Sequence, residues 1–156
     1  MKKIAIIRIK GKVGLPIKVK DTLQMLRLFN KHTCTIVENN PNYIGMIKKV
    51  KDYITWGELD EETFSLLLTK RGKLPGNKLL EESYIEEKTK LSLKDYVKEY
   101  FEGNKNLKDI PGLKSFFRLK PPEKGFEKEG IKKHYIVGGA LGDRSKDVNK
   151  LIQRMI

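Results

Sequence analysis

Two segments of the sequence combine cations with glycines, prolines and aromatic residues, a combination suited to binding a polyanion. They read RIKGKVGLP at residues 8–16 and FFRLKPPEKGFEKEGIKKH at residues 116–134. Lysine and arginine neutralise phosphates and release counterions, which supplies affinity that does not depend on base sequence. Pro121 and Pro122 stiffen the second segment into an extended path. These residue types point to a nucleic-acid backbone as the ligand.

The aromatic residues of the second segment allow two interpretations. Phe116, Phe117 and Phe126 carry rings that can stack on unpaired bases, a contact worth roughly 1–3 kcal/mol each. Alternatively, the rings at 116 and 117 pack in the core beneath the segment, and we expect this of at least one of them.

Few groups in the sequence are suited to catalysis or metal binding. His32 and His134 are the only histidines and Cys34 the only cysteine, without CxxC or HExxH spacing. We expect Cys34 to be a small core residue and His32 to be solvated at a turn. The run GGALG at 138–142 lacks the spacing of a dinucleotide or phosphate-binding loop, so we assign its glycines to close approach of the backbone to another chain or to RNA. We predict no catalytic residue, no metal and no cofactor.

The net charge also indicates a polyanionic partner. The 156 residues include 33 Lys and Arg and 20 Asp and Glu, for a formal net charge of +13. Residues 1–58 carry a net +8, residues 59–113 a net −1 and residues 114–156 a net +6. The simplest interpretation is that the two basic ends meet in space and share one polyanion. The alternative is solvated lysine on every face, as in many heat-adapted proteins.

Hydropathy and cysteine content indicate the cellular compartment in which the protein is expected. No apolar run approaches the roughly 18 residues that a membrane-spanning helix needs, so we expect no membrane partner. The apolar stretch IAII after MKK is too short for a signal peptide. A single cysteine agrees with a reducing cytoplasm.

The first sixty residues have the pattern β-α-β-α-β. Strands are predicted at 3–10, 33–40 and 53–59 from their β-branched and apolar content. Helical spacing of apolar residues covers 18–30, and a second helix begins at Pro41 after the N-cap Asn40. Lys48 and Lys49 lie mostly off the apolar stripe of that helix. They either extend the cationic face or only form a solvated helix surface.

The remainder is predicted to be helical and then irregular. Helices are expected at 61–71 and around 92–102, with Gly72 and Gly103 as left-handed ends and Ser92 as an N-cap. Residues 74–83 are predicted as a turn or linker and 110–117 as a short helix. HYIV at 134–137 is predicted as a strand and 145–156 as a helix. We therefore expect three parts: a core at 1–58, a helical extension at 59–113, and a basic Gly/Pro-rich loop with a short strand and C-terminal helix at 114–156.

A series of motifs, in order along nearly the whole chain, resembles the large-subunit ribosomal protein thirty family in its longer archaeal form. The motifs are IRIKGKVGLP, LRL with an aromatic, the PNYIGMIKKVKDYITWGEL block, TKRG, FRLKPP, HYIVGG, ALGDR and KLIQRM. The eukaryotic counterpart is called large-subunit protein seven. One segment departs from the family: PPEKGF places Glu123 and Phe126 where a basic residue and two glycines are usual, and Lys124 can replace the charge.

The resemblance implies an α+β fold, with a ferredoxin-like β-α-β-α-β core and an antiparallel sheet. It implies a non-enzymatic structural protein of the large ribosomal subunit that binds large-subunit rRNA and helps assembly. The implied partners are large-subunit rRNA and neighbouring ribosomal proteins, with the chain a monomer in the cytoplasmic ribosome and no small-molecule substrate. Together with the charge pattern, it gives these RNA-binding candidates: Arg8, Lys10, Lys12, Lys48, Lys49, Arg118, Lys120, Lys124, Lys132, Lys133, His134 and Arg144.

Two other classes of function stay open at this point. A small RNA-processing enzyme would depend chiefly on His134 as its general acid or nucleophile. A ferredoxin-like ligand-binding module would usually pair its sheets in a dimer.

Overall fold

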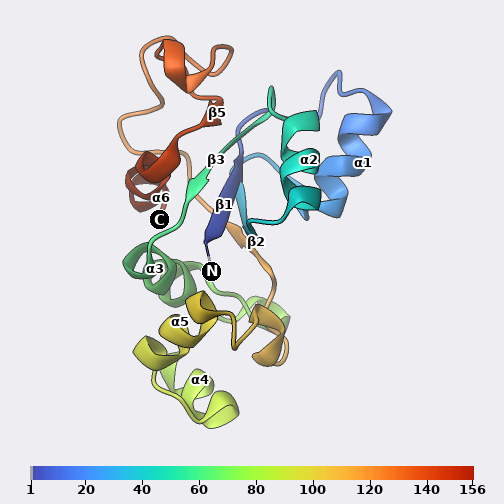
Figure 1. Ribbon diagram of the computed structural model, residues 1–156. Coiled ribbons are helices and arrows are strands. Elements are labelled where there is room, and N and C mark those ends of the chain that lie inside the picture. Colours follow the sequence, from blue (N-terminus) through green and yellow to red (C-terminus); the bar gives the residue numbers. More distant parts are fainter. Residues whose placement is uncertain (1) are drawn as a thin grey trace.

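The computed structural model describes residues 2–156, and its architecture follows from the central strand β1, Lys3–Arg8. All six residues of β1 are buried. Because side chains alternate along a strand, Ile4 and Ile6 enter one apolar cluster while Ala5 and Ile7 enter another. A strand that is apolar on both faces requires a helical layer on each side of the sheet. Figure 1 shows helices on both sides of β1.

The predicted β-α-β-α-β core forms the centre of the sheet and one helical layer. Strands β2, Thr33–Glu38, and β3, Ile54–Glu58, lie antiparallel on either side of β1. Helices α1, Ile17–Met25, and α2, Pro41–Lys49, cover the face that carries Ile4 and Ile6 (Figure 1). The ferredoxin-like core expected from the sequence is confirmed.

The opposite face is covered by helices from the rest of the chain. Two helices pack on this face of the sheet: α3, Glu61–Arg71, and α6, Val148–Met155. Helix α5, Leu93–Glu102, packs on α3. Helix α4, Glu82–Thr89, lies outermost against α5. One apolar cluster contains Ala5, Phe64, Tyr96, Phe117 and Leu151, so residues from all three predicted segments share it.

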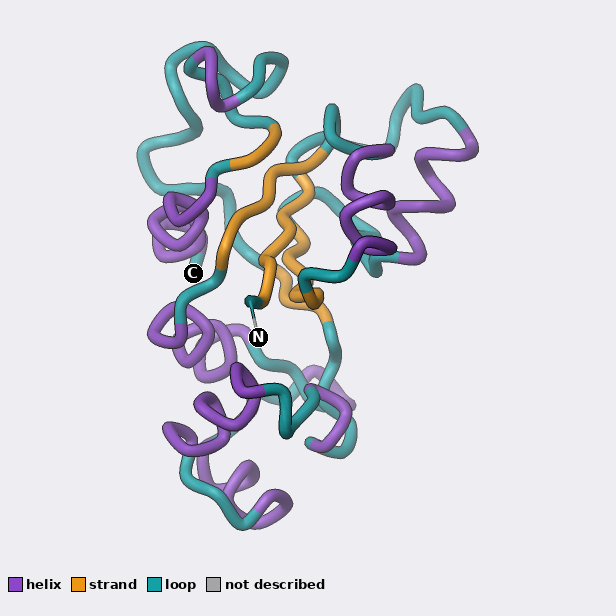
Figure 2. Tube along the Cα trace, viewed as in Figure 1, coloured by secondary structure: helices purple, strands orange, loops and turns teal. Residues whose placement is uncertain are grey.

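Two short strands complete the sheet and make it mixed rather than antiparallel. Strand β4, Phe116–Arg118, pairs antiparallel with β2, whereas β5, Gly142–Asp143, pairs parallel with β3. The strand order is β4-β2-β1-β3-β5. The expectation of a wholly antiparallel sheet is therefore corrected at this one edge, where the chain returns through a long loop (Figure 2).

Three local predictions are wrong. Residues 116–118 form a strand rather than the end of a short helix, because Phe117 pairs with Cys34 and enters the core. Residues 135–137 form a 3₁₀ turn rather than a strand, and the strand follows at 142–143. The segment taken as a linker ends in α4, whose single buried residue Ile85 gives a weak periodic signal. Further 3₁₀ turns lie at Pro75–Asn77, Leu107–Asp109 and Ser145–Asp147.

Helix ends mostly follow their local sequence. Ser92 accepts a hydrogen bond from the Asp95 amide at 3.3 Å, and Gly103 ends α5 at a φ of 93°. Gly72 differs from its prediction, since its φ is −58°. A Cβ there would overlap the carbonyl oxygen of Leu68 and lie 2.9 Å from Cβ of Leu80, so close packing requires this glycine.

Candidate nucleic-acid interface

The sheet register brings the two basic segments to one end of the molecule. Arg8, at the end of β1, is opposite Ile54, at the start of β3. On the other side, Thr33 of β2 is opposite Arg118 of β4. Thr55 is opposite Gly142 of β5. The loops 9–16 and 119–141 therefore leave the sheet at the same end, which we call the basic end.

Loop 119–141 is folded onto itself. Within it, Glu129 N–H donates to the Gly138 carbonyl at 3.2 Å and Ala140 N–H to the Gly130 carbonyl at 3.1 Å. The Gly139 amide donates to the His134 carbonyl at 2.9 Å. A loop with its own hydrogen bonds presents its cations in a fixed arrangement, which lowers the ordering cost of binding.

The Arg144 side chain holds this loop against the sheet. Its Nη2 donates to Glu127 Oε2 at 2.6 Å and to the Ala140 carbonyl at 3.1 Å, and its Nη1 also donates to Glu127. Its Nε donates to Thr55 Oγ1 at 2.9 Å, while the guanidinium lies 4.6 Å from the ring centre of Tyr135. The Arg144 side chain is 2% exposed. One buried side chain, directly after β5, thus joins β3 to the middle and the C-terminal end of the loop.

Glu127 is charged in this network. Burial alone raises its pKa, but hydrogen bonds from Arg144 and the charges of Arg144 and Arg154 outweigh that effect. The pKa of Glu127 therefore lies below its ordinary value. Arg154 also donates to the Gly125 carbonyl at 3.0 Å, which ties α6 to the loop.

Most predicted RNA-binding lysines are exposed. Lys133 forms an ion pair with Glu129 at 2.5 Å, and Lys10 is half-buried with its ammonium 5.4 Å from the ring centre of Tyr53. No ion pair with a carboxylate of residues 2–156 is formed by the other exposed members of the set. These are Lys12, Lys48, Lys49, Arg118, Lys120, Lys124 and Lys132.

Two predicted RNA contacts, Arg8 and Arg144, are buried. Arg8 is 3% exposed and donates to the carbonyls of Leu28 at 2.7 Å, Gly11 at 2.8 Å and Lys10 at 2.9 Å. Its guanidinium holds loop 9–16 against the turn before β2. We therefore propose that Arg8 and Arg144 position the two loops and that the exposed lysines contact RNA.

His134 lies at the basic end and links the loop to β3. Its Nε2 is 3.2 Å from Asp52 Oδ1. Asp52 precedes β3, so this contact fixes the start of the 3₁₀ turn near Tyr53. Sequence analysis did not identify Asp52, because its partner is 82 residues away.

The aromatic residues divide between core and loop support. Phe117 is fully buried, as expected of one of the pair, whereas Phe116 packs edge-on against Phe29 at 5.5 Å. Phe126 is stacked at 6.1 Å on His32. His32 is therefore not simply solvated, and burial together with Lys31 lowers its pKa. The partial burial of Phe126 explains why a large side chain is accepted at this position of the loop.

The glycines of GGALG serve the loop itself rather than approach to another chain. A Cβ on Gly139 would overlap the Lys133 carbonyl. Gly138 and Gly142 both have a φ of 89°, which favours glycine. The close approach predicted from the glycines is real, but the other backbone belongs to the same loop.

Apolar residues at the loop tips were missed by sequence reasoning. Val13 is 99% exposed at the tip of loop 9–16, and Ile136 is 88% exposed in loop 119–141. The HYIV run suggested a buried strand, but its position before two glycines was the available signal for a turn.

Cys34 is unsuited to act as a nucleophile. It is fully buried, and burial raises the pKa of its thiol to about 12. A thiol reagent reacts with the thiolate and must also reach this buried side chain, so we expect labelling at pH 8 to be slower in the folded protein than in urea by roughly a hundredfold or more. Equal labelling rates in the two conditions would show that the strand opens readily. Among residues 2–156, no cluster of three or more His, Cys, Asp or Glu side chains is arranged to hold a metal ion.

The fold and the basic end define an α+β protein built to present cations to a polyanion. None of the helices in residues 2–156 combines the length and apolar character needed to span a membrane. The family model described as ribosomal protein L30p/L7e matches residues 4–54.

Relatives extend the match to almost the entire chain. The large ribosomal subunit protein uL30 of Methanopyrus kandleri is 45% identical over 148 residues, which is 94% of this chain and 99% of the relative. The uL30 of Nanoarchaeum equitans is 47% identical over 152 residues, 97% of each chain. The uL30 of Methanococcus maripaludis is 44% identical over 97% of this chain and 98% of its own. The chain therefore belongs to the L30p/L7e family of ribosomal proteins.

Proposed function

We propose that the chain is a structural, non-catalytic component of the large ribosomal subunit that binds large-subunit rRNA through its basic end and supports assembly. The observation that carries the proposal is the register that places loops 9–16 and 119–141 at one end of the sheet. It functions as a monomer within the cytoplasmic ribosome, beside other ribosomal proteins. The division into an rRNA-binding core at 1–58, a helical extension at 59–113, and a basic Gly/Pro-rich loop with a short strand and C-terminal helix at 114–156 belongs to this proposal.

The mechanism is charge neutralisation by a preformed surface. Exposed lysines displace counterions from phosphates, and the internal hydrogen bonds of loop 119–141 keep them in place before binding. The loop is already folded without RNA, and Arg144 maintains its geometry. Lysine, as a compact point charge, suits phosphate contacts better than base recognition.

Removing three lysines at the basic end should weaken binding and its salt dependence together. The triple variant Lys12→Gln, Lys124→Gln, Lys132→Gln loses three exposed cations. We expect the slope of log K against log salt to become shallower by about 0.7–0.9 for each phosphate that the variant no longer neutralises, or roughly two to three units in total. Filter binding to deproteinised large-subunit rRNA across a salt series measures this slope.

The matched control removes the same charge from the middle segment. Lys78→Gln, Lys94→Gln, Lys98→Gln changes three exposed lysines between residues 59 and 113. We expect this variant to retain the parental slope. Equal reductions in both variants would mean that net charge alone attracts RNA and that no defined face exists.

Sedimentation of the tagged protein in cell lysate tests the assignment to the large subunit. We expect co-migration with the large subunit that survives moderate salt. Migration as a free small protein would overturn the assignment.

A further inference from the structure

The outer edge of β2 is paired along only half its length. Strand β4 covers Thr33–Thr35, and the chain departs at Ser115. The Leu119 amide donates to the His32 carbonyl at 3.0 Å, so backbone groups of even-numbered residues in β2 face this edge. The pairing of Thr35 with Phe116 directs the Ile36 N–H toward the Ser115 carbonyl. Beyond that point the Ile36 carbonyl and the Glu38 N–H face the edge and make no backbone hydrogen bond with any of residues 2–156. These two groups are left at an open edge.

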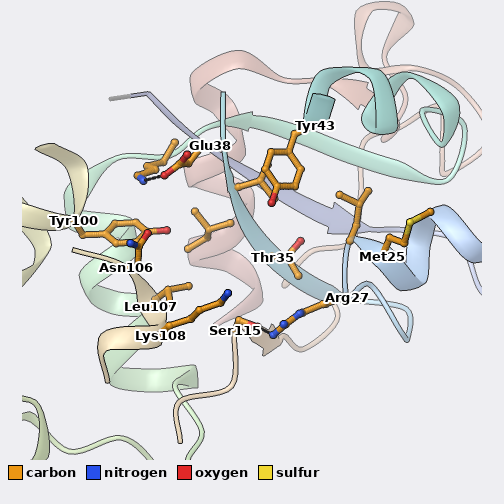
Figure 3. A pocket seen from close by; sticks show the side chains of 14 residues that line it. Met25, Arg27, Thr35, Glu38, Tyr43, Tyr100, Asn106, Leu107, Lys108 and Ser115 are labelled. Carbon is orange, nitrogen blue, oxygen red and sulfur yellow. Dashed lines mark hydrogen bonds and ion pairs between the residues drawn. The ribbon is translucent and has the colours of Figure 1, made fainter. Parts of the chain in front are cut away.

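A groove of about 480 Å³ runs along this open edge (Figure 3). Its floor is Thr35–Glu38 of β2. Tyr43 lines it on the α1/α2 side, and Tyr100 and Leu107 line it on the extension side. A chain in this groove could pair with Ile36 and direct alternate side chains toward the two tyrosines, as in strand addition to a sheet edge.

The charges of the groove favour an acidic occupant. Lys3 and Glu38 neutralise each other at 3.0 Å. Arg27 donates to the Ser115 hydroxyl, and neither Arg27 nor Lys108 forms an ion pair with a carboxylate of residues 2–156. Figure 3 shows Lys108 extending across the groove toward β2. Two unpaired cations thus remain beside an open strand edge.

We propose that this groove binds an extended, acidic segment of a neighbouring protein in the large subunit, added as a strand beside Ile36. The inference rests on the proposed function, because it requires assembly into the subunit. A peptide backbone supplies a donor to the Ile36 carbonyl and an acceptor for the Glu38 N–H, and a carboxylate pairs with Lys108 or Arg27. RNA fits less well, because a phosphodiester backbone does not carry the alternating donors and acceptors with which a strand edge pairs.

Site-specific photocrosslinking within purified large subunits tests the proposal. A photoreactive phenylalanine analogue replaces Tyr43, which lines the groove, or, as the matched control, Tyr84 on α4, which does not. We expect position 43 alone to crosslink to a protein peptide that contains Asp or Glu, identified by mass spectrometry. Hydrogen exchange at the Glu38 amide should be about tenfold slower in the subunit than in the free protein.

The outcomes separate the two proposals. If the protein co-sediments with the subunit but position 43 crosslinks to rRNA, or to nothing, the strand-addition proposal is overturned. Unchanged exchange at the Glu38 amide would also overturn it. If the protein does not co-sediment at all, the proposed function itself fails, and the groove proposal falls with it.

Discussion

Replacing Arg144 by alanine is expected to lower the free energy of unfolding by about 3 kcal/mol, since it leaves the partly buried charge of Glu127 without its main partner. The change also removes the donors to Thr55 Oγ1 and to the Ala140 carbonyl. Chemical denaturation followed by circular dichroism measures the decrease. Because loop 119–141 is attached through Arg144, rRNA affinity should fall although no exposed lysine is changed.

The control for Arg144 is an exposed ion pair in the same region. Lys150 pairs with Asp147 at 3.0 Å, with its side chain 81% exposed. We expect Lys150→Ala to have no measurable effect on stability. A similar result for Arg144→Ala would show that water replaces the network at no cost in stability.

The pH dependence provides a second test of the Arg144 network. The pKa of Glu127 is depressed in the folded state, so its contribution is present above the unfolded pKa of about 4.3 and is lost as pH falls through the folded value. Parental protein and Arg144→Ala should therefore differ most in stability at neutral pH and less in acid. A difference that stays constant down to acid pH would mean that packing, rather than the charge of Glu127, is responsible.

Replacing Gly57 by alanine is expected to destabilise the protein by about 3 kcal/mol through overpacking. A Cβ at Gly57 would overlap the Ser145 carbonyl oxygen and lie 2.9 Å from Cβ of Val148. Neither neighbour can yield easily, because one is backbone and the other begins α6. Helix α6 must then move away from β3, and the Arg144 amide would no longer reach the Trp56 carbonyl, to which it donates at 2.9 Å.

A second glycine serves as the control for Gly57. Gly45 lies in α2, and a Cβ there meets nothing within 4 Å. Gly45→Ala should raise stability by roughly 0.5–1 kcal/mol, since alanine favours a helix. If Gly57→Ala proves as harmless as Gly45→Ala, α6 is not held against β3 as tightly as the structure indicates. Chemical denaturation measures both changes in stability. It should be followed by circular dichroism as well as by Trp56 fluorescence, because Trp56 is next to Gly57 and its signal can change with the substitution itself.

The part of the fold that local patterns specify was predictable. The run KIAIIR has apolar residues on both faces, and Asn40–Pro41 and Ser92 mark helix starts, so the β-α-β-α-β order follows from residues close in sequence. The residues after 110 were less predictable. Phe116–Arg118 becomes a strand only because β2 offers an edge, and Gly142–Asp143 only because β3 does.

The candidate interface was likewise predictable in part. Its cations were evident as residue types, and the net charge of each segment showed that both ends of the chain are basic. The tertiary structure alone separates exposed Lys12 and Lys132 from Arg8 and Arg144, whose donors are taken up by carbonyls and by Glu127. Charge is a property of the residue, whereas its availability depends on partners that lie far away in sequence.

The sequence by itself determined the basic character, the central strand and the order of the core elements, because each depends on composition or on spacing over a few residues. Only the tertiary structure decided that the two basic segments meet, since this depends on the register of Arg8 with Ile54 and of Thr33 with Arg118. It likewise decided why Gly57 and Gly139 are glycines, because their close neighbours are backbone atoms of other segments. Contacts across such separations arise from packing the whole chain, and no local pattern encodes them.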